Sequence, residues 1–368
     1  MKIALIRKNY TPFGGAENYL IQVAKELAKM RHDIHILSAG QWEEAGFRLH
    51  KIKTISKPSL LSNLSFSMAL DDVLSKESFD CILNFERTGH HSIYRAGDGC
   101  HREWLNIRKR HEPFCKAMSF FLNPHHRALL YLEKKTFENS KIIIANSNMV
   151  KNDIIRNYST PSKKIHVIYN GVDIEKFQPA DDEKKAAVKY SMGLQRMKVV
   201  LFVGADLDRK GLPVLLKAFS VMKDKGVKLL VAGKKAKCRH ISSAKRLGIQ
   251  KDVVFWGPEK DIAKLYTAAD IFVLPTIYDP FSNATIEAMA SGLPVITTSS
   301  NGASELIDNG VEGYVINNPA DHKLIAEKIS SALSQNQEMG KKAREKAARY
   351  PIKDAVDKIV ALISGVKK

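Results

Sequence analysis

The sequence predicts an α/β fold made of two doubly wound, Rossmann-like domains, each built around a parallel sheet. Short apolar runs alternate with helical patterns along the whole chain, which is typical of parallel sheets buried on both faces. The same order of strands and helices starts again near residue 199. The length of 368 residues is also too great for one ordinary hydrophobic core and suits two domains.

The first half opens as strand, glycine loop, helix and strand. Its strand-like runs read KIALIR, DIHILSA, FDCILNF and KIIIANS. Between the first two runs, apolar side chains recur at helical spacing at Ala16, Leu20, Val23, Ala24 and Leu27. This order predicts the first crossover unit of a doubly wound domain.

The second half repeats the pattern after a polar, lysine-rich stretch at residues 179–198. Its strand-like runs read VVLFVG, VKLLVAGK, DVVFWG, IFVLPT and PVITTS. Within VIYNGVD, the pair Asn170-Gly171 supplies a turn between two structured halves. We therefore place the first domain at residues 1–168 and the second at residues 169–350.

The last helix follows a break in the pattern at Tyr350-Pro351 and extends to about Ser364. We expect this segment, residues 351–368, to pack back onto the first domain.

The composition limits the classes of function. A formal net charge of +19 predicts a surface that attracts polyanions, whether nucleic acid, anionic lipid or phosphorylated substrates. The chain shows no zinc-finger spacing, recognition-helix signature or RNP-like motif, so we expect no nucleic-acid partner and keep a non-catalytic nucleic-acid-binding protein as a remote alternative. Neither a membrane-spanning run nor a secretory signal is found, and four scattered cysteines fit reduced thiols, so we expect a cytoplasmic protein.

The first candidate site motif is TPFGGAENYL. Gly14 and Gly15 follow the first predicted strand and precede a helix, at the end of the sheet where open α/β folds bind ligands. Two glycines let backbone N–H groups approach a phosphate, and the helix N-terminus adds a partial positive charge. The spacing is not G-x-G-x-x-G and does not predict dinucleotide binding; a tight turn without a ligand is equally compatible.

The second motif is VGADLDRKG, after the first strand of the second half. Arg209 and Lys210 stand just before Gly211 and a predicted helix. Two adjacent cations at this position could bind a diphosphate and stabilise the charge on a leaving nucleotide. In isolation, such a pair is also compatible with solvated surface.

The third motif is the most specific and reads IFVLPTIYDPFSNATIEAMASGLPVITTSSNGASELIDNG. A buried strand ends in a loop that carries Asp279, Phe281 and Asn283, and seven residues separate Asp279 from Glu287 on the following helix. The helix places Glu287 where its carboxylate could accept hydrogen bonds from ribose hydroxyls, while N–H groups at residues 283–285 face a diphosphate.

Together these motifs resemble the retaining glycosyltransferase family 4, whose C-terminal half carries an acidic residue, seven others and then Glu. The resemblance extends from Met1 to about Ile316 and includes the FGGAE loop, the NGVD linker, the RKG turn and the strand end at residues 255–257. Within the family the chain is most similar to the lipopolysaccharide core glucosyltransferase I group, because residues 95–105, RAGDGCHREWL, have an Asp at a strand end followed by Cys.

The resemblance implies a GT-B fold, in which two Rossmann-like domains face each other across a cleft and the C-terminal helix crosses back to the first. The first domain would bind the acceptor and the second the nucleotide-sugar donor. The implied donor-binding residues are Gly14, Gly15, Arg209, Lys210, Asp279, Phe281, Asn283, Ala284, Thr285 and Glu287. The implied catalytic residues are Asp98, Arg209, Lys210 and Asp279.

Two positions depart from the family pattern. The first acidic residue of the motif, usually Glu, is Asp279, which leaves the donor sugar open. Ala205 stands where many relatives have Arg, and Arg209 is expected to compensate. No D-x-D motif stands in a suitable loop for a divalent metal, so we expect Arg209, Lys210 and the helix N-termini to supply the positive charge without a cofactor.

Asp98 is the obvious candidate for a carboxylate near the anomeric carbon. A double displacement would use it as nucleophile, which we do not favour. In the family the leaving phosphate is thought to take the acceptor's proton on the same face, so Asp98 would orient the acceptor or act as a general base. A structural strand-end cap is the alternative.

A basic and apolar segment, SFFLNPHHRALLYLEKKTF, suits an interface with anionic lipid. The residues assigned to acceptor or membrane contact are Phe120, Phe121, Arg127, Lys134 and Lys135. A buried helix with a solvated basic face is the alternative. We expect peripheral association with the cytoplasmic face of the inner membrane, because an enzyme with a lipid-anchored acceptor must reach the bilayer.

The expected activity is transfer of glucose from UDP-glucose to a lipopolysaccharide core or related glycolipid. Other donors in the same family, namely UDP-N-acetylglucosamine, UDP-galactose and GDP-mannose, stay open, as do O-antigen and exopolysaccharide acceptors. A nucleotide-sugar epimerase or a pyridoxal-type phosphorylase also uses doubly wound domains. The chain lacks the length and lysine context of such a phosphorylase, and the spacing around Asp279 and Glu287 does not fit an epimerase.

Overall fold

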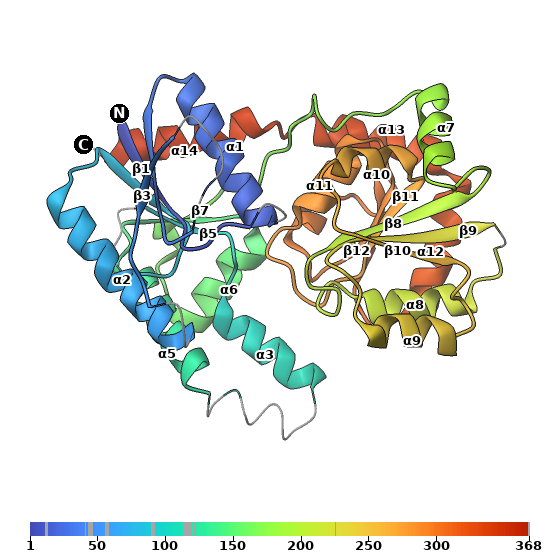
Figure 1. Ribbon diagram of the computed structural model, residues 1–368, viewed down its shortest axis with the longest axis horizontal. Helices are drawn as coiled ribbons and strands as arrows, with labels where there is room; N and C mark the ends of the chain where they lie inside the picture. Colours follow the sequence, from blue (N-terminus) through green and yellow to red (C-terminus); the bar gives the residue numbers. More distant parts are fainter. Residues whose placement is uncertain are drawn as a thin grey trace. The chain divides into compact units, whose positions relative to one another are not determined.

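The computed structural model divides the chain into two compact units. It describes residues 1–11, 14–40, 42, 47–55, 59–89, 93–112, 120, 123–224 and 226–366. Unit 1 comprises Met1–Tyr169 with Ile352–Lys368, and unit 2 comprises Asn170–Pro351. Each unit is an α/β layer structure around one sheet (Figure 1).

Unit 1 contains a seven-stranded sheet in the order β3-β2-β1-β4-β5-β6-β7, in which every neighbouring pair is parallel. The strands are β1 Lys2–Ile6, β2 Asp33–Ser38, β3 Arg48–Lys51, β4 Cys81–Asn84, β5 Ile93–Ala96, β6 Ile142–Ala145 and β7 Ile165–Val167. The central strand β1 is apolar throughout its last four residues, which are fully buried. A strand covered on both faces needs such a continuous apolar run.

The helices of unit 1 cover the two faces of this sheet. They are α1 Gly15–Lys29, α2 Ser59–Lys76, α3 His101–His111, α5 Pro124–Asn139, α6 Asn148–Tyr158 and α14 Ile352–Val366, with a short η1 at Ser162–Lys164. Leu20, Val23 and Leu27 of α1 share a buried cluster with Val356 and Ile359 of α14. The C-terminal helix therefore belongs to the first unit, which confirms that part of the predicted fold.

Unit 2 contains a six-stranded parallel sheet in the order β10-β9-β8-β11-β12-β13. The strands are β8 Lys198–Gly204, β9 Val227–Gly233, β10 Val253–Gly257, β11 Ile271–Leu274, β12 Val295–Thr298 and β13 Gly313–Ile316. The helices are α7 Asp182–Ser191, α8 Leu212–Val221, α9 Cys238–Arg246, α10 Ile262–Ala268, α11 Asn283–Ala290, α12 His322–Ser334 and α13 Asn336–Ala347, with η2 at Gly302–Leu306.

Each sheet has one point where the strand order reverses, between β1 and β4 in unit 1 and between β8 and β11 in unit 2. Loops that leave the carboxyl ends of strands at such a point diverge to opposite sides, and ligands of open α/β sheets bind there. The candidate donor-binding residues follow β1, β8 and β11. None of the helices in the described residues is long and apolar enough to cross a membrane.

Candidate active site

The loops after β8 and β11 meet because these two strands are neighbours in unit 2. Lys210 lies in the first loop and Asp279 in the second. Gly211, with φ of +90°, brings the first loop directly against the second, because a Cβ at this position would lie 2.0 Å from the carbonyl oxygen of Pro275. Only glycine adopts this conformation with no side chain to clash, so the turn depends on it.

The contact between the loops is fixed by the backbone of Arg209. Its carbonyl oxygen accepts hydrogen bonds from the Thr276 hydroxyl and from the Ile277 N–H, both at 3.0 Å. Its guanidinium donates to the carbonyl oxygen of Tyr278 at 2.5 Å and lies 3.7 Å from the carboxylate of Asp206. The side chain is thereby held along the second loop and not released into solvent.

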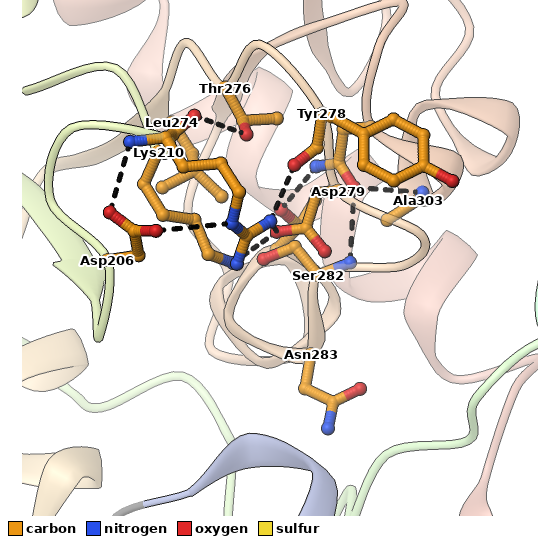
Figure 2. Close-up of polar contacts among 12 residues, drawn as sticks. Asp206, Lys210, Leu274, Thr276, Tyr278, Asp279, Ser282, Asn283 and Ala303 are labelled. Atoms are coloured by element: carbon orange, nitrogen blue, oxygen red, sulfur yellow. Dashed lines mark hydrogen bonds and ion pairs between the residues drawn. The ribbon is translucent and has the colours of Figure 1, made fainter. Parts of the chain in front are cut away.

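Lys210 and Asp279 form an ion pair at this meeting point, in which Lys210 Nζ donates to Asp279 Oδ2 (Figure 2). Arg209 lies 4.0 Å from the same oxygen. Burial lowers the pKa of Lys210, although the neighbouring Asp279 carboxylate opposes this shift. Asp279 is only 5% exposed. Its N–H donates to the Ser300 carbonyl at 2.8 Å, so the loop after β12 holds the carboxylate in place.

Asn301, which the sequence analysis did not single out, organises the surrounding loops. Its side chain is fully buried; the amide oxygen accepts from the N–H groups of Ser282 and Ala303, both at 3.1 Å. The amide nitrogen donates to the hydroxyls of Thr285 at 3.1 Å and Thr297 at 3.0 Å. An Asn-Gly pair directly after a strand-like run was the available signal, but it was compatible with an ordinary turn.

The helix α11 begins beside this ion pair with Ser282 as its N-cap. Ser282 is 2% exposed, and its hydroxyl oxygen has no hydrogen-bond partner within the described part of the chain. Asn283 accepts from the side chain of Asn170 at 2.6 Å and projects away from the Lys210–Asp279 pair (Figure 2). The first N–H groups of a helix are unpaired within it and attract anions.

The remaining donor-site candidates lie along the same segment. Phe281 and the Thr285 side chain are buried, and Ala284 is partly exposed. Glu287 is partly buried one turn into α11, where its carboxylate accepts from the Tyr266 hydroxyl at 2.9 Å. Burial raises the pKa of Glu287, and this hydrogen bond from Tyr266 counteracts the rise. Tyr266, on α10, was another residue that the sequence motifs did not indicate.

A D-x-D sequence does occur beside the basic pair, at Asp206 and Asp208, but cations of the chain engage both carboxylates. Asp206 lies near Arg209, and Asp208 pairs with Arg239 and lies 3.1 Å from Nε2 of His240. The two aspartates and His240 line a hollow of about 220 Å³. Each carboxylate therefore has a cationic neighbour.

In unit 1 a second charged cluster forms where three adjacent strands end. Arg7 follows β1, Glu86 follows β4 and Asp98 follows β5. Arg7 donates to Asp98 at 2.8 Å and to Glu17 at 3.0 Å, and lies 3.4 Å from Glu86. The sequence analysis indicated only Asp98. A charged residue directly after each strand-like run was the signal for the others, since carboxyl ends of parallel strands share one edge.

Asp98 is held ionised by this cluster. Desolvation by surrounding protein atoms opposes ionisation, but Arg7 and Arg87 outweigh it and lower the pKa of the carboxyl. The Asp98 side chain remains 37% exposed. Arg87 is fixed in turn by the fully buried Glu133, to which it donates at 3.0 Å. The carboxylate is therefore a partly exposed negative charge that Arg7 holds in place.

The glycine pair before α1 has a local explanation in unit 1. Gly14 is the N-cap, and a Cβ on it would lie 1.7 Å from Oε2 of Glu17. Glu17 is 7% exposed and places its own carboxylate at this helix start, where it pairs with Arg7. Gly15, the first residue of α1, is exposed.

The acceptor and membrane candidates separate into buried and exposed groups. Phe120 is 6% exposed, with the Arg108 guanidinium 4.0 Å above its ring. Arg127, Lys134 and Lys135 are exposed on α5. Phe121 lies outside the described residues.

Comparison with known proteins decides the family. A model described as glycosyltransferase family 4 matches residues 13–176, and a model described as glycosyl transferases group 1 matches residues 192–350. The chain belongs to glycosyltransferase family 4. It is an enzyme of this class, and its fold is GT-B, as the sequence predicts.

Individual relatives match nearly the whole chain of this glycosyltransferase. An uncharacterised glycosyltransferase of Methanocaldococcus jannaschii is 28% identical over 85% of this chain and 84% of its own. The lipopolysaccharide glucosyltransferase WaaG of Escherichia coli K12 is 22% identical over 91% of this chain and 90% of its own.

Solved structures agree on the architecture. A WaaG crystal structure superposes with a TM-score of 0.87 at 21% identity, covering 99% of this chain and 100% of that one. Anabaena HepE, solved in complex with UDP-glucose, gives a TM-score of 0.80 at 19% identity, with 99% and 100% coverage. At such identities the likeness establishes the fold.

Proposed function

We propose that this glycosyltransferase transfers glucose, with retention, from UDP-glucose to a lipopolysaccharide core or related cell-envelope glycolipid. The observation that carries the donor half of the proposal is the Lys210–Asp279 pair at the β8/β11 switch point, beside the start of α11. A cation for phosphate and a carboxylate for sugar hydroxyls stand next to each other there. The printed names of WaaG and HepE support glucose and a uridine donor.

The pyrophosphate would bind between the basic pair and α11. Arg209 and Lys210 supply charge-assisted hydrogen bonds, and the N-terminus of α11 supplies backbone N–H groups. The buried Ser282 hydroxyl offers one more group for hydrogen bonding at this point. When the phosphate binds, Lys210 would donate hydrogen bonds to it in place of part of its contact with Asp279. The Asp279 carboxylate would then accept a hydrogen bond from a hydroxyl of the donor sugar.

Glu287 would accept hydrogen bonds from the ribose. The Tyr266 hydroxyl occupies one of its oxygens, Oε2, and so orients the other. The leaving diphosphate gains its stabilisation from Arg209, Lys210 and the helix end, without a metal ion. The pairing of Asp206 and Asp208 with Arg209, Arg239 and His240 supports this part of the proposal.

Asp98 would orient the acceptor and stabilise positive charge near the reaction centre. Its pKa is lowered, so it is a weak base at neutral pH, and a role as proton acceptor is less favourable than an electrostatic one. The leaving phosphate would then take the proton of the acceptor hydroxyl on the face from which it departs. Arg7, paired with Asp98 at 2.8 Å, would keep the carboxylate in a fixed position.

The acceptor is proposed from the name of WaaG and from surface charge. Arg127, Lys134 and Lys135 on α5 give an exposed basic strip that suits anionic lipid headgroups. The enzyme would work peripherally at the cytoplasmic face of the inner membrane, where a lipid-anchored acceptor is reached without a membrane span.

A donor panel tests this function. UDP-glucose, UDP-N-acetylglucosamine, UDP-galactose and GDP-mannose are each assayed for slow hydrolysis without acceptor, in the presence of a chelator. We expect UDP-glucose to be hydrolysed fastest and the chelator to have no effect. Preference for another donor would reassign the sugar, and loss of all activity in the chelator would contradict the metal-free transfer.

A further inference from the structure

Two histidines and a glutamate converge in unit 1 toward the amino ends of its strands. His35 lies in β2 and His50 in the edge strand β3, and both project on one face because Leu37, two residues after His35, is the register partner of His50. Glu77 directly follows α2, which packs on that same face through Leu70. Three elements therefore bring these side chains together, away from the charged cluster at the carboxyl ends.

The distances within this cluster are short. His35 Nδ1 lies 2.7 Å from His50 Nε2 and 3.8 Å from Glu77 Oε1, and His50 Nδ1 lies 3.3 Å from Glu77 Oε2. On its other side, His35 Nε2 lies 3.2 Å from the Asp33 carboxylate. The Phe79 ring meets both imidazoles edge to face, with centroids 5.4 and 6.1 Å away, and restricts their rotation.

The positions of the carboxylates determine where the imidazole protons go. An ionised carboxylate only accepts, so Asp33 favours the proton on His35 Nε2 and Glu77 favours the proton on His50 Nδ1. The two nitrogens that face each other, His35 Nδ1 and His50 Nε2, are then both unprotonated, and their lone pairs point at each other. Any other neutral arrangement turns a bare ring nitrogen toward a carboxylate. A cation between the facing nitrogens removes this conflict.

We propose that His35, His50 and Glu77 bind a divalent metal ion of the zinc class, through His35 Nδ1, His50 Nε2 and a carboxylate oxygen of Glu77. The ligand atoms of the three residues lie within 4.8 Å of one another. Zinc takes imidazole nitrogen and carboxylate oxygen at about 2.0–2.2 Å, and a tetrahedral site places two such nitrogens about 3.3 Å apart. The facing nitrogens must therefore separate by several tenths of an ångström.

The surroundings permit this adjustment. His35 is 1% exposed and fixed, whereas the His50 side chain is 25% exposed on an edge strand and has room to move. Asp33 would orient His35 from outside the coordination sphere, an arrangement common behind metal-bound histidines. Glu77 Oε1, 3.8 Å from His35 Nδ1, would bind the metal once Lys2, now 2.7 Å from this oxygen, moves aside, and Oε2 would keep its contact with His50 Nδ1.

Such an ion would be structural and separate from sugar transfer. It would join β3, the four-residue edge strand of the unit 1 sheet, to the end of α2. The metal-free chemistry proposed above concerns unit 2 and does not depend on this site.

The proposal is tested by zinc titration of the whole chain. The protein is purified without a histidine tag and stripped of metal with a chelator. Zinc is added in competition with a chromophoric chelator, and we expect one tight site per chain. His50→Ala and Glu77→Gln should each weaken binding at least about 100-fold, and Asp33→Ala about 10-fold. His322→Ala, in unit 2, is the matched control and should bind zinc as the parent does.

Thermal unfolding with and without zinc gives a second readout that does not rest on one variant folding well. The melting temperature of the parent should rise with zinc, because a ligand of the native state stabilises it. The rise should be absent in His50→Ala and present in His322→Ala. Equal zinc binding by the parent and His50→Ala would overturn the proposal. Absence of tight binding to the parent would also overturn it and would leave a shared proton as the cation between the rings.

Discussion

Lys210 combines a structural contact with the position that we propose for donor binding. It neutralises the 5% exposed Asp279, and it stands where a donor phosphate would bind. The sequence shows that Lys210 is adjacent to Arg209, but it does not show that Lys210 forms an ion pair with Asp279. Lys210 and Asp279 are 69 positions apart in the sequence, and only the sheet order brings them together.

Replacing Lys210 with alanine should weaken UDP binding about 10- to 100-fold, because a charge-assisted hydrogen bond contributes roughly 1.5–3 kcal/mol. Isothermal calorimetry measures this effect. Lys217→Ala, an exposed lysine on α8, is the control and should bind UDP normally. Unchanged affinity in a folded Lys210→Ala protein would remove the basis of the donor site.

Asp98→Asn should spare nucleotide binding and lower turnover by at least about 100-fold, because the variant loses a charge near the reacting atoms. The pH profile gives an independent check. Since the pKa of Asp98 is lowered by Arg7 and Arg87, the charge persists above that pKa and is lost only as the pH falls through it. We expect no loss of activity from Asp98 between about pH 5 and 7. A fall in activity of the parent between pH 7 and 5 that is absent in Asp98→Asn would contradict this expectation. It would mean that the ion pair with Arg7 does not lower the pKa of Asp98.

Tyr266→Phe should raise the pKa of Glu287 further, because the hydroxyl hydrogen bond is the main influence that counteracts the effect of burial. As the pH is lowered, UDP binding should begin to weaken at a higher pH in Tyr266→Phe than in the parent. Affinity measured from pH 5 to 8 checks this shift. An identical pH dependence in the two proteins would mean that Glu287 does not bind the nucleotide in its ionised form.

At the scale of elements, apolar runs were sufficient for most strands and insufficient for β3, β5, β7 and β13. KIALIR and VVLFVG became β1 and β8, whereas β3, with sequence RLHK, has exposed residues and no apolar pattern. The strand β5, IYRA, contains a charged residue, Arg95, which is buried 4.1 Å over the Tyr19 ring. A tertiary cation–π contact of this kind leaves no local signal.

The loop after β12 was missed for a related reason. Asn301 makes two hydrogen bonds to the start of α11, at Ser282 and Thr285, and two to its own neighbourhood, and a single Asn-Gly pair does not reveal the distant ones. The loop after β12 and the start of α11 are therefore joined by one buried amide. The motif residues were predictable, but the residue that holds them was not.

Asn301→Ala should destabilise unit 2 by about 2–4 kcal/mol, because it leaves buried N–H and hydroxyl groups without partners. A lower melting temperature and faster hydrogen exchange at the amides of Ser282 and Ala303 are the measurements. Asn318→Ala removes an exposed asparagine and serves as control. Equal stability of the two variants would contradict the role given to Asn301.

At the scale of the whole molecule, strand and helix periodicity predicted two doubly wound units because it repeats twice along the chain, and the resemblance to the family implied the GT-B fold. The net charge of +19 predicted an attraction to polyanions without identifying one. Arg127, Lys134 and Lys135 are exposed on α5, where we propose that this attraction acts.

Vesicle sedimentation tests the membrane proposal. Binding should rise with the fraction of anionic lipid and fall with salt, since screening shortens the reach of surface charges. Lys134→Glu with Lys135→Glu should weaken binding more than Lys245→Glu with Arg246→Glu, which makes the same change of charge on α9. Equal loss in the two double variants would indicate a general charge effect without a specific surface.

The central claim is that fixed cations and a helix end in unit 2 hold a nucleotide diphosphate without a metal ion. A crystal soaked with UDP in the presence of a chelator tests it most directly. The account predicts the phosphates within hydrogen-bonding distance of Arg209 and Lys210 at the start of α11, with the ribose at Glu287. A nucleotide bound elsewhere, or one that binds only when a divalent metal bridges it to the protein, would contradict the account.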